Sequence, residues 1–343
     1  MRSSLPRLTA VTTAALVLAA GPLLTACSDG PAGDVPTIDP ATPAVSPPAR
    51  SDLPGAVRQV GSTIDFLTLD ADSGVVAMLG ADRSTLLLAG TGDAAAPIRQ
   101  VALPAPAKGL SAGRAGEALV PAGDRVFRVN LADGATQEVS TGGDAVSATW
   151  APDDSLAVGT SNGEVRLIDP ASGSTTVIDG LVSADALAVT GDSLVALDRR
   201  QSSVTEINLD DDSLGLALRA GDGATNIVGD DLGRLVVTDT TDGELLSFTA
   251  EPLVLHQRFP VGSSPYAVAV DNRSGIVWLT STATNEVVGY DLSSGIPEET
   301  ARYATVRQPN SLAVDERTGD LLVGSAAGDG LQTIPASSSQ GGR

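Results

Sequence analysis

A unit of about forty residues repeats along most of the chain, and this repetition constrains the fold more than any other feature. Its clearest copy covers residues 265–295, where three short apolar segments are separated by turns rich in Asp, Asn and Gly. The next copy begins at Pro309 as this one begins at Pro265. Seven units can be anchored on their second strands: Val75, Ala118, Leu156, Leu194, Leu235, Val277 and Leu321.

Short strands separated by turn residues and repeated at this period indicate a β-propeller, in which each unit forms one blade. The alternative, a pair of all-β sandwiches, also uses many short strands but does not produce turn sets in phase. We therefore predict an all-β, seven-bladed β-propeller over residues 56–335, and we expect the polar tail 336–343 to be disordered.

The two ends of the repeat region are complementary. The last unit ends after its third strand, near Ile334, whereas the strand expected over residues 56–60 precedes the first complete unit and has no partner of its own. Pairing this segment with the last unit would complete the final blade and remove an exposed sheet edge. We predict that this N-terminal strand closes the ring.

The first 26 residues have the pattern of an export signal. Arg2 and Arg7 supply positive charge and precede an apolar run without charged residues, residues 8–20. This run is shorter than the roughly 20 residues that span a bilayer, but it suits a signal peptide. Residues 24–27, Leu-Thr-Ala-Cys, resemble the bacterial lipobox, which implies cleavage before Cys27 and a diacylglyceryl group on its thiol. The alternative is an ordinary signal peptide with an incidental cysteine.

Residues 28–54 contain seven prolines and no hydrophobic period. Such a composition favours extended polyproline II structure. We expect residues 27–55 to form a lipidated cysteine and a tether that separates the propeller from the membrane. The predicted location is therefore the extracytoplasmic face of the cell membrane.

Two segments carry a family resemblance. PYAVAVDNRSGIVWLT, residues 265–280, and PNSLAVDERTGDLLVGS, residues 309–325, are similar to the NHL and YVTN-type repeats of YncE-like propellers. Together with the lipobox, the chain resembles the actinobacterial propeller lipoproteins of the LppL type. That family has no established activity, so the resemblance implies a fold and a location in the cell envelope but no mechanism.

Charge and composition exclude several functions. The net charge is −21 and Lys108 is the only lysine, which argues against nucleic acid as a partner and against electrostatic attachment to anionic lipid. With one histidine, His256, and one cysteine, the chain cannot build a zinc site from His and Cys, and a catalytic base beside a nucleophile is not expected.

Three Asp-rich segments, residues 70–74, 209–213 and 271–275, are compatible with Ca²⁺, which prefers oxygen ligands. However, Asp at the start and Gly at the end of a β-turn explain the recurring pattern without a metal. We predict no cofactor, and Ca²⁺ or another divalent cation remains the open alternative.

Propellers bind ligands on the face where each innermost strand begins. Aligning the units by their turns places one polar or charged residue of each unit near this rim, as candidate ligand-binding residues: Asp65, Lys108, Ser147, Asp185, Thr225, Tyr266 and Asn310. The alternative is a solvated channel mouth without a ligand.

We expect a monomeric, non-catalytic binding scaffold whose partner is an envelope protein or a glycan. The alternative is a metal-dependent hydrolase similar to the gluconolactonase type of lactonase, whose metal is held by Glu, Asn and Asp. Asn310, Asp65 and Asp185 match part of that set, but no glutamate falls on the rim.

Overall fold

The computed structural model describes residues 36–93 and 95–336, which form β-strands and connecting turns with no α-helix. The predicted signal peptide, Cys27 and the tail beyond residue 336 lie outside the described residues. Within the described part, no helix has the length and apolar character needed to cross a membrane.

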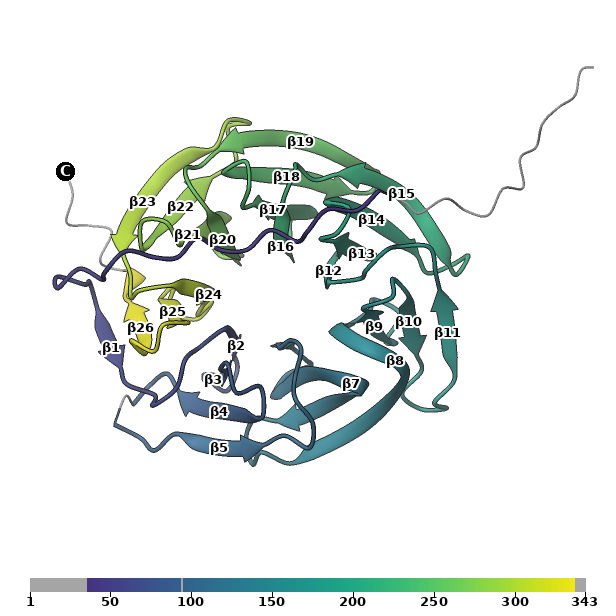
Figure 1. The fold of residues 1–343 in the computed structure, drawn as a ribbon, viewed down its shortest axis with the longest axis horizontal. Coiled ribbons are helices and arrows are strands. Elements are labelled where there is room, and N and C mark those ends of the chain that lie inside the picture. The colour runs from purple at the N-terminus through teal and green to yellow at the C-terminus, as the bar shows by residue number, and fades with distance from the viewer. Residues whose placement is uncertain (1–35, 94, 337–343) are drawn as a thin grey trace, which may run out of the picture. The chain divides into compact units, whose positions relative to one another are not determined.

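Antiparallel sheets follow one another around a common centre (Figure 1). Four sheets contain four strands that are consecutive in the chain. Their strands are β2 (Phe66–Asp70), β3 (Val75–Leu79), β4 (Thr85–Gly90) and β5 (Arg99–Ala102); β12 (Ala186–Thr190), β13 (Ser193–Asp198), β14 (Ser203–Asn208) and β15 (Ser213–Arg219); β16 (Ala224–Gly229), β17 (Arg234–Asp239), β18 (Glu244–Ala250) and β19 (Leu253–Pro260); and β20 (Pro265–Asp271), β21 (Ile276–Ser281), β22 (Glu286–Asp291) and β23 (Glu298–Ala304).

A fifth sheet contains six strands, and the sixth sheet closes the ring. The six-stranded sheet comprises β6 (Ser111–Ala112), β7 (Glu117–Asn130), β8 (Thr136–Trp150), β9 (Leu156–Thr160), β10 (Val165–Ile168) and β11 (Thr175–Ile178). The closing sheet comprises β24 (Pro309–Val314), β25 (Leu321–Ser325), β26 (Leu331–Ile334) and β1 (Ala56–Arg58). The described chain is therefore a six-bladed β-propeller.

The prediction of seven blades is wrong. The units anchored at Ala118 and Leu156 were expected to form separate blades, but β7 and β8 are long and join both units in one sheet. The ladder between β7 and β8 shifts register between Gly123 and Arg125, and Gly123 has a φ of 63°. The pairing is interrupted opposite residues 141–144 of β8 and resumes at Ala145, so one continuous sheet contains both sequence units.

The turns form as the residue pattern predicts. In the turn after β20, the Asp271 carboxylate accepts a hydrogen bond from the backbone N–H of Arg273 at 3.1 Å, and Gly275 adopts a φ of 72°. Asp315 makes the same contact with the N–H of Arg317 at 3.0 Å. These carboxylates are occupied by their own turns and by arginine side chains, which supports the turn interpretation over the calcium interpretation.

The hydrophobic core is divided among the interfaces between neighbouring sheets. Phe127 of β7, for example, is fully buried in a cluster with Leu79 and Leu88 of the preceding blade. A further cluster lies within the six-stranded sheet, where Leu119 and Leu156 belong to different sequence units. Burial of each such side chain contributes about 1.5–3 kcal/mol, so stability is distributed around the ring.

The strand β1 pairs antiparallel with β26, with Val57 opposite Gln332. The sheet order is β1-β26-β25-β24, so the N-terminal strand is the outermost strand of the closing sheet. This is the pairing predicted for segment 56–60. The N-terminal and C-terminal strands of the propeller therefore close the ring by hydrogen bonds between segments nearly the whole chain apart.

The strap, which we define as residues 36–54, has no regular secondary structure and runs across the propeller to β1 (Figure 1). Its Ile38 N–H donates to the carbonyl of Arg200 at 2.8 Å, and its Pro54 carbonyl accepts from Gln332 at 2.9 Å. The sequence predicted a tether over residues 27–55, and within residues 36–54 the structure shows hydrogen bonds to the propeller. Residues 27–35 of the predicted tether lie outside the described residues.

We expect Gly55→Ala to weaken the closure of the ring. A Cβ atom at Gly55 would lie 2.0 Å from the Thr333 carbonyl oxygen, and Gly55 has a φ of +73°. Gly61 has the same φ but no atom within 4 Å of such a Cβ, so Gly61→Ala is the matched control. The control should lose about 1–2 kcal/mol in denaturant unfolding, and Gly55→Ala clearly more. If Gly55→Ala and Gly61→Ala lowered the free energy of unfolding equally, the result would contradict close packing of Gly55 against Thr333.

The stability contributed by Asp315 should depend on pH. Burial alone would raise its pKa, but hydrogen bonds from the Arg317 side chain and N–H outweigh burial and lower the pKa of Asp315. The stabilisation is thus present above the ordinary carboxyl pKa of about 3.9 and is lost as pH falls through the lowered value. Asp315→Asn should cost about 1.5–3 kcal/mol at neutral pH.

The measurement is chemical unfolding of the wild type and Asp315→Asn at neutral and acidic pH. The difference between the two proteins should shrink at the acidic end. Exposed Asp192 provides the control, since Asp192→Asn should change stability little at either pH. A difference for Asp315→Asn that stays constant with pH would contradict the assignment.

Candidate functional site

The face on which the innermost strands begin carries both the predicted rim and the strap. Tyr266 and Asn310 are the second residues of β20 and β24, and Asp65 directly precedes β2. The strap contacts Ser264 and Gln308, which directly precede β20 and β24. Rim and strap therefore share one face of the propeller.

Three of the seven rim candidates line one cavity of about 160 Å³ among the first strands of four blades, β2, β16, β20 and β24. Asp65, Tyr266 and Asn310 line it together with Asn226 and with backbone and apolar side chains of the same strands. A carboxylate, a phenol and amide groups provide both hydrogen-bond donors and acceptors within a small volume. The cavity therefore suits a polar group, such as a sugar hydroxyl or a peptide end.

The carboxylate of Asp65 is partly buried and has one cationic neighbour. Arg83 lies 3.3 Å from it and stacks over the Phe66 ring, with the guanidinium carbon 4.7 Å from the ring centre. Burial raises the pKa of Asp65, and the positive charge of Arg83 opposes this rise. Arg83 thus helps to keep a charged acceptor at the cavity.

The other four rim candidates do not line this cavity. Lys108 forms an ion pair with Asp144. The Ser147 hydroxyl donates to the Ala184 carbonyl at 2.7 Å, while Thr225 is buried and its hydroxyl lies 2.6 Å from that of Thr240. These three side chains connect neighbouring strands and loops.

Asp185 also has a structural role. Its carboxylate accepts hydrogen bonds from the Ser183 hydroxyl and from the N–H of Arg199 at 2.8 Å. It does not line the cavity that contains Asp65 and Asn310. The carboxylates of the predicted metal set are therefore not gathered around that cavity.

Sequence reasoning missed three residues at this face. Asn226 lies in the cavity wall and donates to the Tyr266 carbonyl at 3.0 Å. Gln308 donates to the side-chain oxygen of Asn310 at 3.1 Å and also binds the strap. Arg83 lies in the turn between β3 and β4, beside the start of β2, so its proximity to Asp65 follows from the hairpin, whereas the roles of Asn226 and Gln308 depend on side-chain orientation.

Among the described residues, one cluster of acidic side chains could gather around a cation. Carboxyl oxygens of Asp239, Asp242 and Glu244 lie within 4.8 Å of one another. Burial and the neighbouring carboxylates, Asp239 in particular, raise the pKa of Asp242. Arg258 forms ion pairs with Asp242 and Glu244, and Asp239 accepts hydrogen bonds from the backbone of its own turn. The negative charge of these three carboxylates is thus already compensated by Arg258 and by backbone N–H groups.

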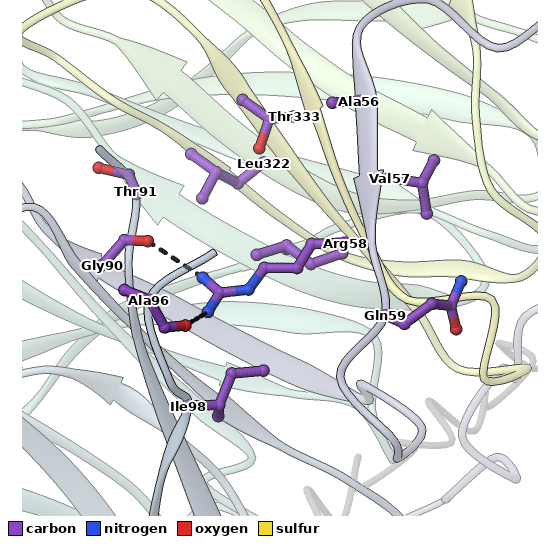
Figure 2. A pocket seen from close by; sticks show the side chains of 11 residues that line it. Ala56, Val57, Arg58, Gln59, Gly90, Thr91, Ala96, Ile98, Leu322 and Thr333 are labelled. Atoms are coloured by element: carbon purple, nitrogen blue, oxygen red, sulfur yellow. Dashed lines mark hydrogen bonds between the residues drawn. The ribbon is translucent and has the colours of Figure 1, made fainter. Parts of the chain in front are cut away.

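A larger cavity, of about 450 Å³, lies at the seam where β1 meets the next blade (Figure 2). The Arg58 side chain points from β1 into this seam and donates to the carbonyls of Gly90 and Ala96. These contacts attach the closing strand to the following blade. Most of the lining side chains are apolar, and Arg58 binds backbone carbonyls. The contacts at this cavity are therefore explained by closure of the ring.

The single histidine, His256, lines neither the cavity at Asp65 nor the cavity at Arg58. His256 is exposed on β19, the last strand of its sheet, and its Nε2 lies 3.1 Å from the Thr249 hydroxyl. The channel cavity, by which we mean the cavity lined by Asp65, Tyr266 and Asn310, does not include His256.

Comparison with known proteins supports the fold class. No family model matches the chain, and no curated protein matches it. Among solved structures, the chain is similar to hydrazine synthase of Kuenenia stuttgartiensis, with 13% identity, a TM-score of 0.68, and coverage of 84% of this chain and 97% of that one.

Two further structures are similar over most of their length. Virginiamycin B lyase from Staphylococcus aureus has 13% identity and a TM-score of 0.67, over 81% of this chain and 97% of that one. The Cps50 (Swd1) β-propeller domain of Myceliophteria thermophila has 14% identity and a TM-score of 0.68, over 82% and 99%. At such low identity, these likenesses show the propeller fold alone.

We expect Arg83→Ala to raise the pKa of Asp65 further, because the opposing positive charge is removed while burial remains. A carboxyl-selective NMR titration of the wild type and the variant measures this change. Arg50→Ala, which removes an exposed arginine paired with Asp52, is the control and should leave Asp65 unchanged. An unchanged Asp65 titration in Arg83→Ala would contradict the coupling.

Proposed function

We propose that the protein is a lipid-anchored propeller of the extracytoplasmic envelope that binds a ligand at its channel mouth without catalysing a reaction. The observation that carries the binding role is the cavity lined by Asp65, Tyr266 and Asn310. The lipobox resemblance at residues 24–27 supports the anchor, and the LppL-type resemblance supports the envelope location.

The chemistry of the cavity favours an uncharged polar ligand or one with a positive group. Its only carboxylate, Asp65, is a hydrogen-bond acceptor, and the amides of Asn226 and Asn310 can donate or accept. At about 160 Å³, the cavity admits one sugar ring or one peptide terminus rather than a whole cofactor. We therefore propose an envelope glycan or a protein segment as the partner, bound by a monomer.

Neither alternative activity has support from a specific observation. In the hydrolase hypothesis, Asp185 would act with Asp65 and Asn310, but Asp185 lies outside their cavity. One similar structure is a lyase, yet the chain's single histidine is exposed on an outer strand, and the likeness extends only to the fold. A binding role is therefore the one we propose.

The binding role predicts a ligand-dependent rise in melting temperature. Full-length protein should be screened against soluble cell-wall glycan fragments and short peptides, since a ligand at one hundred times its Kd stabilises by about 2.7 kcal/mol. Tyr266→Ala with Asn310→Ala should abolish the rise, and the exposed control Leu232→Ala should retain it. A rise that survives the double substitution would place the ligand elsewhere.

The anchor predicts that Cys27→Ser moves the protein from the membrane fraction to the soluble fraction. The serine hydroxyl cannot accept the diacylglyceryl group in place of the thiol, and the chain has no other cysteine. Labelling with a radioactive or alkyne fatty acid, followed by fractionation, measures both effects. Ser28→Ala keeps the thiol and is the control. Fatty-acid labelling of Cys27→Ser would refute the anchor.

A further inference from the structure

The strap is bound to the propeller by a set of hydrogen bonds concentrated on residues 44–47, Ala-Val-Ser-Pro. The N–H of Ala44 donates to the Ser264 hydroxyl at 2.9 Å. The Pro47 carbonyl accepts from the side-chain amide of Asn285 at 2.8 Å. Both ends of this four-residue segment are thus fixed by side chains of the propeller.

Gln308 binds the middle of the segment as a neighbouring strand would. Its side-chain oxygen accepts from the N–H of Ser46 at 3.0 Å, and its side-chain nitrogen donates to the Ala44 carbonyl at 3.0 Å. This pair of contacts spans residues i and i+2 of an extended chain, which is the spacing of one edge of a β-strand. Gln308 therefore recognises backbone conformation and not side-chain identity.

The Ser46 hydroxyl supplies the only side-chain contact of the segment among these hydrogen bonds. It donates to the Thr282 carbonyl at 2.6 Å and accepts from the N–H of Gln308 at 3.0 Å. A hydroxyl uses one donor and one acceptor here, so alanine could make neither contact. The site thus selects serine at this position.

The propeller side of the contact is a built site. With the strap bound, Thr282 and Asn285 are 0% and 2% exposed, and Ser264 is 8% exposed. Asn285 and Gln308 have φ values of 53° and 55°, in the left-handed region that costs non-glycine residues energy. Both side chains form hydrogen bonds with the strap, and the Asn285 side-chain oxygen also accepts from the Gln308 N–H at 3.1 Å.

Apolar burial does not hold this segment in place. Val45, between the two bound residues, is 92% exposed. Pro43, Pro47 and Pro48 restrict the backbone to extended conformations before binding, which lowers the entropy lost on docking. Polar recognition of a preformed extended chain is a mode by which proteins bind peptides of other proteins.

We infer that this face carries a peptide-binding site for an extended segment of the pattern small-x-Ser-Pro. Residues 44–47 occupy this site in cis, and a segment of another protein with the same pattern occupies it in trans. This inference does not rest on the proposed function, because it uses neither Cys27 nor the channel cavity. The strap acts as a competitor, since a tethered segment has an effective concentration of the order of millimolar.

The first part of the test asks whether the named contacts hold the strap. Full-length protein carrying Cys27→Ser and Val45→Cys is labelled with a fluorophore at position 45, where the side chain is exposed. Adding Gln308→Ala, or Ala44→Pro with Ser46→Ala, should lower the fluorescence anisotropy. Gln100→Ala, an exposed glutamine on β5, is the control and should not. Retained anisotropy in both strap-releasing proteins would overturn the inference.

The second part asks whether the open site binds in trans. A labelled peptide with the sequence of residues 41–50, ATPAVSPPAR, is titrated into full-length protein with Cys27→Ser, Ala44→Pro and Ser46→Ala. Saturable binding is expected, weakened about tenfold by serine-to-alanine replacement in the peptide, because two hydrogen bonds are lost.

Binding should be lost when Gln308→Ala is added to the open protein, and the melting temperature of each variant shows that it is folded. No saturable binding to the open protein would show that the segment docks only in cis, which overturns the inference. Equal affinity for the serine and alanine peptides would overturn it as well. Failure of the lipid or channel experiments would leave these results unaffected.

Discussion

The antiparallel pairing of β1 with β26 is the interaction on which the remaining structure depends. Each blade buries its apolar side chains against its neighbours, so an open ring would leave the faces of two blades in water. The pairing fills the outer position of the closing sheet, and Arg58 extends it to the following blade. A strand of three largely exposed residues thereby closes the ring through its pairing with β26, and the core clusters lie between the blades that this pairing holds together.

The sequence predicted the fold class and the closure, and it overestimated the number of blades. Turn residues such as Asp271 and Gly275 report local backbone geometry, and local geometry repeats with the sequence unit. Blade number depends instead on which strands pair, and the pairing of β7 with β8 continues on both sides of an interruption beside Gly123, so one sheet contains two units. Pairing between strands is not encoded in the turns that flank them.

The candidate site was predicted in part. Tyr266 and Asn310 occupy equivalent places at the starts of β20 and β24, so aligning the repeats found both. Side chains alternate between faces along a strand, so an alignment error of one residue sends a side chain elsewhere. Thr225 occupies the equivalent place in β16, yet it is buried among threonine hydroxyls and the next residue, Asn226, lines the cavity instead. The docking of the strap could not be predicted, because its contacts are polar and mostly with backbone, and they leave no hydrophobic period.

The course of the strap determines how a pulling force enters the molecule. Tension applied from the N-terminal side first meets the contact between Ile38 and Arg200, and then the bonds around Ala44 and Ser46. Only after these contacts yield would the load reach β1, whose three residue pairs close the ring. The strap contacts would therefore bear the load first, and the pairing of β1 with β26 would stay intact until those contacts break.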